Sequence, residues 1–389
     1  DTGCFTTTSL QLNVVPGPVA NTPTPLTYCD PNNDNVGIFD LTSVANQVTG
    51  GAATSTISYH ETFTDADLGV TPIVDPANYS TLTPTSGIQI VYIRVTSTLT
   101  GCYAVVELVL QVNPTPVLVE TALPLQVCDD NSDGIGVFDL TQSINNILNG
   151  LNPALHTVSF HTSEANAQAD SNPIINVLNF SNSVPNTQVI WVRVEINATG
   201  CYSIVPLTLT VNALPVLPLS LPSYSLCETD PTDEREIFAI RDYVTAQLPT
   251  PGYEFAFYFS EADADNNQSP LPDNYENVAN PQTIWIVVTN ETTGCSNKTV
   301  VDLRVEPRPI LQLPLGGLTL CDDNGEGYGN FDLAAEVNNL LNGATGVTVT
   351  FYETLQNAEL AVDALSSPYV NITPYLQFIY IRAENDVTG

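Results

Sequence analysis

The segment CDDNSDGIGVFDLT, residues 128–141, decides how this sequence is organised, because three further copies of it occur in the chain. The copies begin at Cys29, Cys227 and Cys321, so the four segments are spaced by 99, 99 and 94 residues. A second series, the dipeptide Gly-Cys, is spaced by 98, 99 and 94 residues and places its cysteines at Cys4, Cys102, Cys201 and Cys295. Because both series shorten at the same place, one module is repeated in tandem.

Each copy of the segment is followed by a short amphipathic run and then by strand-like runs. In 140–148, apolar residues at 140, 144, 147 and 148 predict a helix of two or three turns that Gly150 ends. Alternating or β-branched runs at 157–161, 190–194 and 106–112 predict strands. We therefore predict an all-β fold of tandem immunoglobulin-like β-sandwich repeats, each with a short helical insertion.

The two cysteine series also predict the domain boundaries. Leu10, Leu12 and Val14 stand six, eight and ten residues after Cys4, as Leu108, Leu110 and Val112 stand after Cys102. Residues 1–16 are therefore expected to be the last strand of a preceding repeat. The repeats that follow are expected at 17–114, 115–213, 214–307 and 308–389, each with a proline-rich, stiff connection at its start and the fourth without its last strand. We interpret the chain as a window of a longer array.

The composition excludes several classes of partner. The formal charge is −34, with 42 acidic residues against 8 basic ones, of which Lys298 is the single lysine. Binding to nucleic acid or insertion into a membrane is not expected, because the first needs basic patches and the second needs an apolar run of about 18 residues. Eight cysteines in a regular framework indicate disulfides and an extracellular location.

Two disulfide pairings are compatible with the spacing. Pairing within repeats joins Cys29 to Cys102, Cys128 to Cys201 and Cys227 to Cys295. Pairing across the linkers joins Cys4 to Cys29, Cys102 to Cys128, Cys201 to Cys227 and Cys295 to Cys321. We favour the pairing within repeats, because the last strand should carry the chain about 30 Å away from the Gly-Cys cysteine before the next repeat starts.

The acidic loops are candidate calcium sites. Alternating Asp and Asn side chains that lead to a glycine can supply the hard oxygen ligands that calcium prefers. The candidate ligands are Asp30, Asn32, Asp34 and Asp40 in repeat 1, Asp129, Asn131, Asp133 and Asp139 in repeat 2, and Asp322, Asn324, Glu326 and Asp332 in repeat 4. The alternative is an ordinary Asx turn followed by an aspartate that caps the helix.

No catalytic constellation is found, so we predict that the chain is not an enzyme. His60 and His161 occupy one repeat position, which in the other repeats is Tyr258 and Tyr352, so this position does not require an imidazole. The sequence contains no phosphate-binding loop, zinc-ligand spacing or nucleophile elbow.

The repeated elements Cys-Asp-x-Asn-x-Asp-Gly, Phe-Asp-Leu-Thr, Ile-Trp-Val-Arg-Val and Thr-Gly-Cys-Tyr resemble the repeats of very large surface proteins of Bacteroidetes, especially flavobacteria. The resemblance covers the whole chain, and the third repeat departs from it in the acidic loop. It implies export by the type IX secretion system, attachment to the cell surface and a part in adhesion or gliding motility.

We therefore expect a structural stalk or spacer of a surface adhesin, whose partners are the neighbouring repeats, surface polysaccharide and other cell-surface proteins. Two alternatives stay open. One is an array of glycan-binding modules that uses exposed loops or the aromatic strand, for instance Tyr92 and Trp191. The other is a filament subunit that completes its fourth repeat with the N-terminal strand of the next copy.

Overall fold

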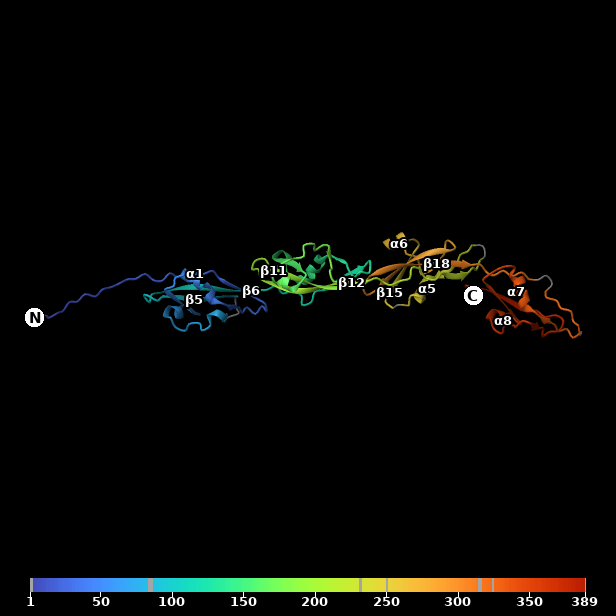
Figure 1. Ribbon diagram of the computed structural model, residues 1–389, viewed down its shortest axis with the longest axis horizontal. Coiled ribbons are helices and arrows are strands. Elements are labelled where there is room, and N and C mark those ends of the chain that lie inside the picture. Colours follow the sequence, from blue (N-terminus) through green and yellow to red (C-terminus); the bar gives the residue numbers. More distant parts are fainter. Residues whose placement is uncertain are drawn as a thin grey trace. The chain divides into compact units, whose positions relative to one another are not determined.

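The computed structural model describes residues 3–82, 87–230, 233–249, 251–313, 317–323 and 325–388. The chain divides into two compact units, Asp1–Asn212 and Ala213–Gly389, and each unit holds two of the repeats. In Figure 1 the first unit runs from blue to green and the second from yellow to red. Asn324, one of the candidate calcium ligands, lies outside the described residues.

Repeat 1 is built on a four-stranded sheet. The strand order is β1 (Leu26–Asp30), β6 (Tyr103–Pro114), β5 (Ile88–Ser97) and β3 (Ser55–His60). Strand β5 is antiparallel to both β3 and β6, whereas β1 runs parallel to β6. Alternate residues of β5 and β6 are buried on one face, as the alternating pattern of a half-buried strand predicts.

A thinner layer covers this face of the sheet. It consists of the ribbon β2 (Ile38–Phe39) with β4 (Tyr79–Ser80) and of the helical segments η1 (Leu41–Val44), α1 (Ala45–Thr49) and η2 (Pro76–Asn78). Helix α2 (Phe63–Leu68) lies on the other face, where Phe63 contacts Tyr92 of β5. Asp40 caps η1 by accepting a hydrogen bond from the Thr42 backbone N–H, and α1 ends at Gly50 in the left-handed conformation. Leu41, Val44 and Val48 are buried against the sheet.

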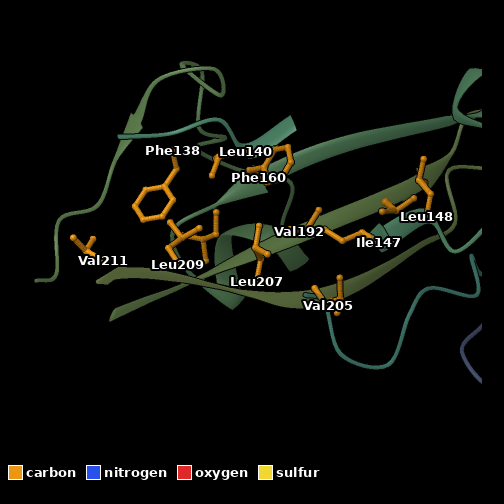
Figure 2. Close-up of a cluster of buried hydrophobic side chains, with 13 residues drawn as sticks. Phe138, Leu140, Ile147, Leu148, Phe160, Val192, Val205, Leu207, Leu209 and Val211 are labelled. Atoms are coloured by element: carbon orange, nitrogen blue, oxygen red, sulfur yellow. The ribbon is translucent and has the colours of Figure 1, made fainter. Parts of the chain in front are cut away.

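Repeat 2 has the same architecture. Its sheet is β7 (Leu125–Asp129), β12 (Tyr202–Ala213), β11 (Thr187–Ile196) and β9 (His156–His161), and its ribbon is β8 (Val137–Phe138) with β10 (Phe180–Ser181). Its helical segments are η3 (Leu140–Ser143), α3 (Ile144–Leu148), η4 (Pro153–Leu155) and α4 (Glu164–Gln168). Figure 2 shows Leu207 and Leu209 of β12 in one cluster with Ile147 and Leu148 of α3.

The second unit contains repeats 3 and 4. Repeat 3 has the sheet β13 (Tyr224–Cys227), β18 (Ser296–Glu306), β17 (Gln282–Asn290) and β15 (Tyr253–Tyr258), the ribbon β14 (Ile237–Ala239) with β16 (Asn274–Glu276), and helices α5 (Ile240–Gln247) and α6 (Glu261–Asn266). Repeat 4 has β20 (Val347–Tyr352) paired with β22 (Tyr380–Asn385), the ribbon β19 (Asn330–Phe331) with β21 (Tyr369–Val370), and helices α7 (Leu333–Leu341) and α8 (Leu355–Leu360).

The predicted fold class is confirmed: the chain is mostly β-sheet, in four repeated immunoglobulin-like domains with short helices. The helix predicted at 140–148 is present and begins as a 3₁₀ turn, although Asn149 and not Gly150 is its left-handed terminal residue. The strand predicted within residues 1–16 is not observed, because the described residues 3–25 have no secondary structure. A strand needs a hydrogen-bonding neighbour, and none of the described strands pairs with this segment.

The proline-rich connections are not free spacers. Ala122 is buried in the core cluster of repeat 2, and the Val119 backbone N–H donates to the Ile147 carbonyl oxygen at 3.3 Å. The connection is therefore largely part of the repeat that follows it. Within the described ranges, no helix is long and apolar enough to cross a membrane.

Candidate functional site

The parallel pairing of β1 with β6 fixes where the first cysteine of a repeat lies. Cys29 is opposite Asn113, near the end of β6, whereas Cys102 directly precedes the first residue of that strand. These positions are about 37 Å apart along the strand, at 3.4 Å per residue. Cys29 therefore lies at the end of repeat 1 from which the chain leaves towards repeat 2.

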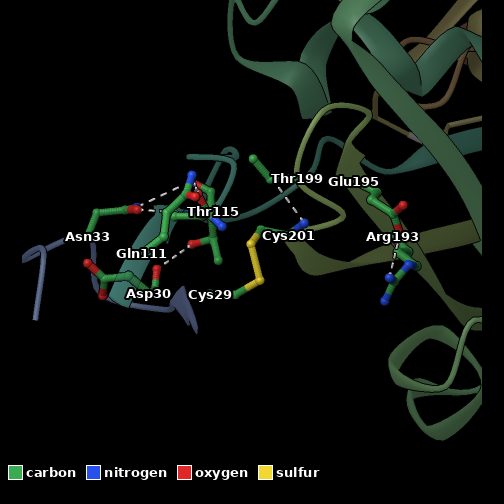
Figure 3. The surroundings of a disulfide bond; sticks show 10 residues. Cys29, Asp30, Asn33, Gln111, Thr115, Arg193, Glu195, Thr199 and Cys201 are labelled. Carbon is green, nitrogen blue, oxygen red and sulfur yellow. Dashed lines mark hydrogen bonds and ion pairs between the residues drawn. A yellow bond between two sulfur atoms is a disulfide. The ribbon is translucent and has the colours of Figure 1, made fainter. Parts of the chain in front are cut away.

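A disulfide bond joins Cys29 to Cys201, which directly precedes β12 of repeat 2. The two Cα atoms are 5.4 Å apart and the sequence separation is 172 residues. Figure 3 shows this bond at the junction between the two repeats, beside Thr115. The bond therefore links neighbouring repeats and does not close a loop within one of them.

This bond contradicts both pairings that the sequence suggested. The favoured bonds Cys29–Cys102 and Cys128–Cys201 do not form, because Cys29 and Cys201 are bonded to each other. The third favoured bond, Cys227–Cys295, does not form because Cys227 is a thiol. Every bond of the pairing across linkers is excluded for the same reasons. Each would use Cys29 or Cys201, which are bonded to each other, or else Cys102 or Cys321, which are thiols. Each pairing assumed that the first cysteine of a repeat lies where the chain enters it.

The remaining cysteines fit the same register. Cys128 and Cys295, which hold the repeat positions of Cys29 and Cys201, are each disulfide-bonded as well. In the second unit, the Cys227 sulfur lies 2.8 Å from the Thr388 hydroxyl oxygen. Thr388 corresponds to Thr199, which stands two residues before Cys201. Cys227 therefore lies beside the same end of the repeat that follows it as Cys29 does.

Hydrogen bonds hold the chain on both sides of the disulfide in the first unit. The Thr115 backbone N–H donates to Asn33 Oδ1 at 2.9 Å, and the Thr115 hydroxyl donates to the Asp30 carbonyl oxygen at 3.0 Å. On the other side, the Ser203 hydroxyl donates to the Pro116 carbonyl oxygen at 2.7 Å. Consecutive linker residues are thus bound to repeat 1 and to repeat 2.

The second unit repeats these contacts with other side chains. Arg308, which stands at the position of Thr115, donates from Nε to the Glu228 carbonyl oxygen at 2.7 Å. Asn297, which stands at the position of Ser203, donates from Nδ2 to the Pro215 carbonyl oxygen at 2.9 Å. Sequence reasoning missed these residues. The sequence offered one signal for them. Thr115 and Arg308 stand at the same offset from the Gly-Cys cysteine of their repeat, and each lies between two prolines.

The acidic loops are held by backbone hydrogen bonds. Asp129 is buried, and its carboxylate accepts from the backbone N–H groups of Ser132 and Gly134, each at 2.8 Å. Burial opposes ionisation of this carboxyl, but the N–H donors, led by Gly134, outweigh it and lower the pKa of Asp129 below its ordinary value. Asp30 and Asp322 accept equivalent bonds in their loops. This is the pattern of a hydrogen-bonded Asx turn.

The last aspartate of each candidate calcium set caps a helix. Asp139 accepts from both the backbone N–H and the hydroxyl of Thr141, and these bonds lower the pKa of the Asp139 carboxyl. Asp40 and Asp332 cap η1 and α7 in the same way. Among the described residues, no three His, Cys, Asp or Glu side chains gather closely enough to hold a metal ion. The arrangement favours the turn-and-cap alternative, and calcium binding stays a prediction.

The buried histidines and the arginine of the aromatic strand have partners within the fold. His60 and His161 are buried, and each ring lies between a serine hydroxyl and a backbone carbonyl oxygen. Arg94 Nη1 donates to the carbonyl oxygens of Ala66 and Asp67 at the end of α2, and the Arg94 guanidinium stacks 3.4 Å above the Tyr103 ring. These side chains are bound within their own repeat.

Solved structures that are similar to this chain include the I-band fragment I67–I69 of titin, with 12% identity, 73% of this chain and 96% of that chain covered, and a TM-score of 0.25. Drosophila OTK extracellular domains 3–5 give 9% identity, 74% and 97% coverage and a TM-score of 0.22. Drosophila N-cadherin EC1-3 gives 10% identity, 75% and 100% coverage and a TM-score of 0.18. At these scores the likenesses support no conclusion about this chain.

Among curated proteins, no match is found. The model of one family, the Flavobacterium inter-domain disulphide bond domain, matches the sequence four times, at residues 25–116, 124–215, 223–309 and 317–389. These matches cover most of the chain, and a bond between domains is what Cys29 and Cys201 form. The chain belongs to the Flavobacterium inter-domain disulphide bond domain family and carries four of its repeats.

Proposed function

We propose that this chain is a force-bearing stalk or spacer of a secreted bacterial surface adhesin or filament, exported by the type IX system and active in adhesion or gliding motility. The tandem repeat fold points to a non-catalytic, structural protein. The observation that carries the proposal is the disulfide between Cys29 and Cys201.

This bond changes the path that tension takes along the chain. A pull that enters before Cys29 passes through the two sulfur atoms to Cys201 and continues along β12. The strands β3, β5, β6, β9 and β11 all lie inside the closed covalent loop. If repeat 1 unfolds, its chain cannot be drawn out, because the Cys29–Cys201 bond carries the load past it. Such a segment keeps its length under a force that unfolds its domains.

The hydrogen bonds of the linker also limit how far the two repeats can be pulled apart. Thr115 is fixed to repeat 1 and Pro116 to repeat 2, so the connection has no slack residue at this point. Stable disulfides form in oxidising compartments, which supports the proposed extracellular location. The net charge of −34 would keep neighbouring stalks apart by repulsion at low ionic strength.

The test is to stretch single molecules of the 389-residue chain with and without reducing agent. The oxidised chain is expected to reach a final extension well below that of the reduced chain, because the loop closed by Cys29–Cys201 stays shut. Equal final extensions would refute the proposal. A glycan array probed with the same preparation tests the binding-module alternative, and the spacer role predicts no glycan-dependent signal.

A further inference from the structure

The two cysteines of the Cys29–Cys201 bond are far apart in the sequence, and other cysteines lie between them. Cys29 and Cys201 are separated by 172 residues, whereas Cys102 and Cys128 are separated by 26. In an unfolded chain the probability that two residues meet falls as about the 3/2 power of the length between them, so the shorter loop closes roughly 17 times more often. A chain that is oxidised before it folds would therefore mostly carry other bonds than the one observed.

Folding takes Cys102 out of reach of Cys29. Cys102 directly precedes β6, and Cys29 is opposite Asn113 near the far end of that strand, so about 37 Å separates the two cysteines within folded repeat 1. A disulfide needs Cα atoms that are no more than about 7 Å apart. The Cα atoms of Cys29 and Cys201 are 5.4 Å apart. The folded repeats thus select Cys201 as the partner of Cys29.

The fold on each side of the junction does not depend on the bond. Among the described residues, the core clusters of repeats 1 and 2 lie within 20–112 and 118–211 and include no cysteine. The Cys102 thiol and the bonded Cys201 stand in the same turn, because each backbone N–H donates to a threonine hydroxyl two residues earlier at 3.3 Å. The strand that carries the Cys227 thiol has the parallel register that the strand of Cys29 has in repeat 1.

The linker brings the two cysteines together through hydrogen bonds. The Thr115 hydroxyl donates at 3.0 Å to the carbonyl oxygen of Asp30, the residue after Cys29, as Figure 3 shows. The Ser203 hydroxyl, two residues after Cys201, donates at 2.7 Å to the carbonyl oxygen of the next linker residue. Each cysteine thus lies within two residues of a hydrogen bond to the same short linker. These bonds hold the two sulfur atoms near each other whether or not the disulfide is present.

The two cysteines differ in how far a reagent can reach them. Cys29 is exposed even in the bonded state, whereas Cys201 is fully buried. Cys102, which holds the position of Cys201 in repeat 1 and is a thiol, is half-buried. Thiol–disulfide exchange depends on the access of one sulfur atom to the other. Cys29 is therefore the cysteine that a dissolved disulfide reaches first.

We propose that the Cys29–Cys201 bond forms after both repeats have folded, that Cys29 takes up the oxidant and Cys201 completes the bond, and that Thr115 and Ser203 position the two thiols. The proposal goes beyond the spacer role and can fail while that role stands. It assigns a reaction class to the last step of maturation, which is oxidation of the folded, reduced chain by an external disulfide.

The covalent step is a thiol–disulfide exchange, and glutathione disulfide serves as the oxidant in the test. The Cys29 thiolate attacks one sulfur of glutathione disulfide, the S–S bond of the oxidant breaks, and one glutathione thiolate leaves. The Cys201 thiolate then attacks the Cys29 sulfur of the mixed disulfide and releases the second glutathione thiolate. Two protein thiols lose two protons and two electrons, and one glutathione disulfide becomes two glutathione thiols.

The order of folding and oxidation is tested with the reduced 389-residue chain. We expect its near-ultraviolet circular dichroism to match that of the oxidised chain. Oxidation by glutathione disulfide in buffer, followed by alkylation and peptide mapping, should give Cys29–Cys201. The same oxidation in concentrated guanidinium chloride should give Cys102–Cys128 roughly 17 times more often than Cys29–Cys201. A reduced chain that is unfolded, or a Cys29–Cys201 bond that forms equally readily in denaturant, would overturn the proposal.

The order of attack is tested with two single variants and a brief exposure to glutathione disulfide that is stopped with acid. The variant Cys201→Ser should acquire glutathione on Cys29 severalfold faster than on Cys102, the half-buried thiol of the same molecule. The variant Cys29→Ser should acquire it on Cys201 no faster than on Cys102. Uptake on Cys201 that is as fast as uptake on Cys29 would refute the assigned order.

The positioning role is tested with Ser203→Ala, and Thr208→Val on the same strand is the matched control. The measurement is the ratio of bonded to reduced Cys29 in a series of glutathione buffers. This ratio is expected to fall about fivefold in Ser203→Ala, the factor that corresponds to the loss of one hydrogen bond, and to stay unchanged in the control. Thr115→Val should act like Ser203→Ala. Equal ratios in Ser203→Ala and the control would show that the linker does not position the thiols.

Discussion

Removing the disulfides should lengthen the chain under tension by an amount that the structure sets. The perturbation is a variant in which Cys29, Cys128, Cys201 and Cys295, the four cysteines in disulfides, are all changed to serine. The Cys29–Cys201 bond alone keeps 172 residues of chain out of the load path. Fully extended at 3.3–3.6 Å per residue, that chain spans about 600 Å.

The folded loop contributes almost nothing to that length, because the bond holds the Cα atoms of Cys29 and Cys201 5.4 Å apart. With both repeats unfolded, the four-serine variant should therefore reach a final extension about 600 Å longer than the oxidised wild type, or more if the bonds of Cys128 and Cys295 restrain further chain.

The assay is stretching in optical tweezers, with handles at both ends of the chain and no reducing agent. The matched control is the double variant Cys102→Ser and Cys321→Ser, which removes two thiols and no disulfide and should extend like the wild type. If the four-serine variant and the wild type reach the same final extension, the load does not pass through Cys29 and Cys201, and the reasoning is wrong.

Other predictions concern the bonds, the loops and the core. Non-reducing peptide mapping is expected to recover Cys29 linked to Cys201, and a peptide that links Cys29 to Cys102 would contradict the structure. Melting curves with calcium and with chelator should coincide if the acidic loops are only turns, whereas a midpoint raised by calcium would establish the site. Because the pKa of Asp129 is lowered in the fold, its carboxylate stabilises the protein above the ordinary pKa of about 3.9, and that stability is lost as the pH falls through the folded value. Asp129→Asn should therefore lower the melting temperature at pH 7 and weaken its fall in acid, and an unchanged acid transition would argue against it. Leu207→Ala, in the core of repeat 2, should cost about 2–5 kcal/mol of unfolding free energy in denaturant titration, against almost nothing for Leu219→Ala, which is 98% exposed.

The period, the strands and the short helix could be predicted because each has a local signal. Alternation identified β6, and the apolar spacing from 140 to 148 identified the helical run. The disulfide pairing could not be predicted, because it depends on which neighbour β1 has and in which direction it runs. A strand of five residues shows which side chains are buried, but parallel and antiparallel pairing bury the same ones. Parallel pairing moves Cys29 to the opposite end of the repeat.

For the acidic loops, the sequence identified the residues but did not determine their role. Asp, Asn and Gly in alternation supply calcium ligands and also build Asx turns. The two roles differ in the partners of the carboxylate oxygens. The sequence does not reveal those partners. In the structure, both oxygens of Asp129 accept backbone N–H groups, and Asp139 is occupied as a helix cap.

Repeat 3 shows that the basic residue of the aromatic strand has a structural role. Repeats 1, 2 and 4 have an arginine there whose side chain reaches the carbonyl oxygens at the end of a short helix, as Arg193 reaches Ala167 of α4. Repeat 3 has Val287 at that position, and Lys298 is directly opposite it on β18. The Lys298 ammonium forms ion pairs with Glu261 and Asp265 of α6, and its hydrogen bonds to these carboxylates, led by Asp265, raise the pKa of Lys298. The positive charge is thus kept beside the same helix although it comes from a different strand. A sugar platform would need the arginine to keep its place on the strand, whereas a tie between sheet and helix needs only a cation within reach.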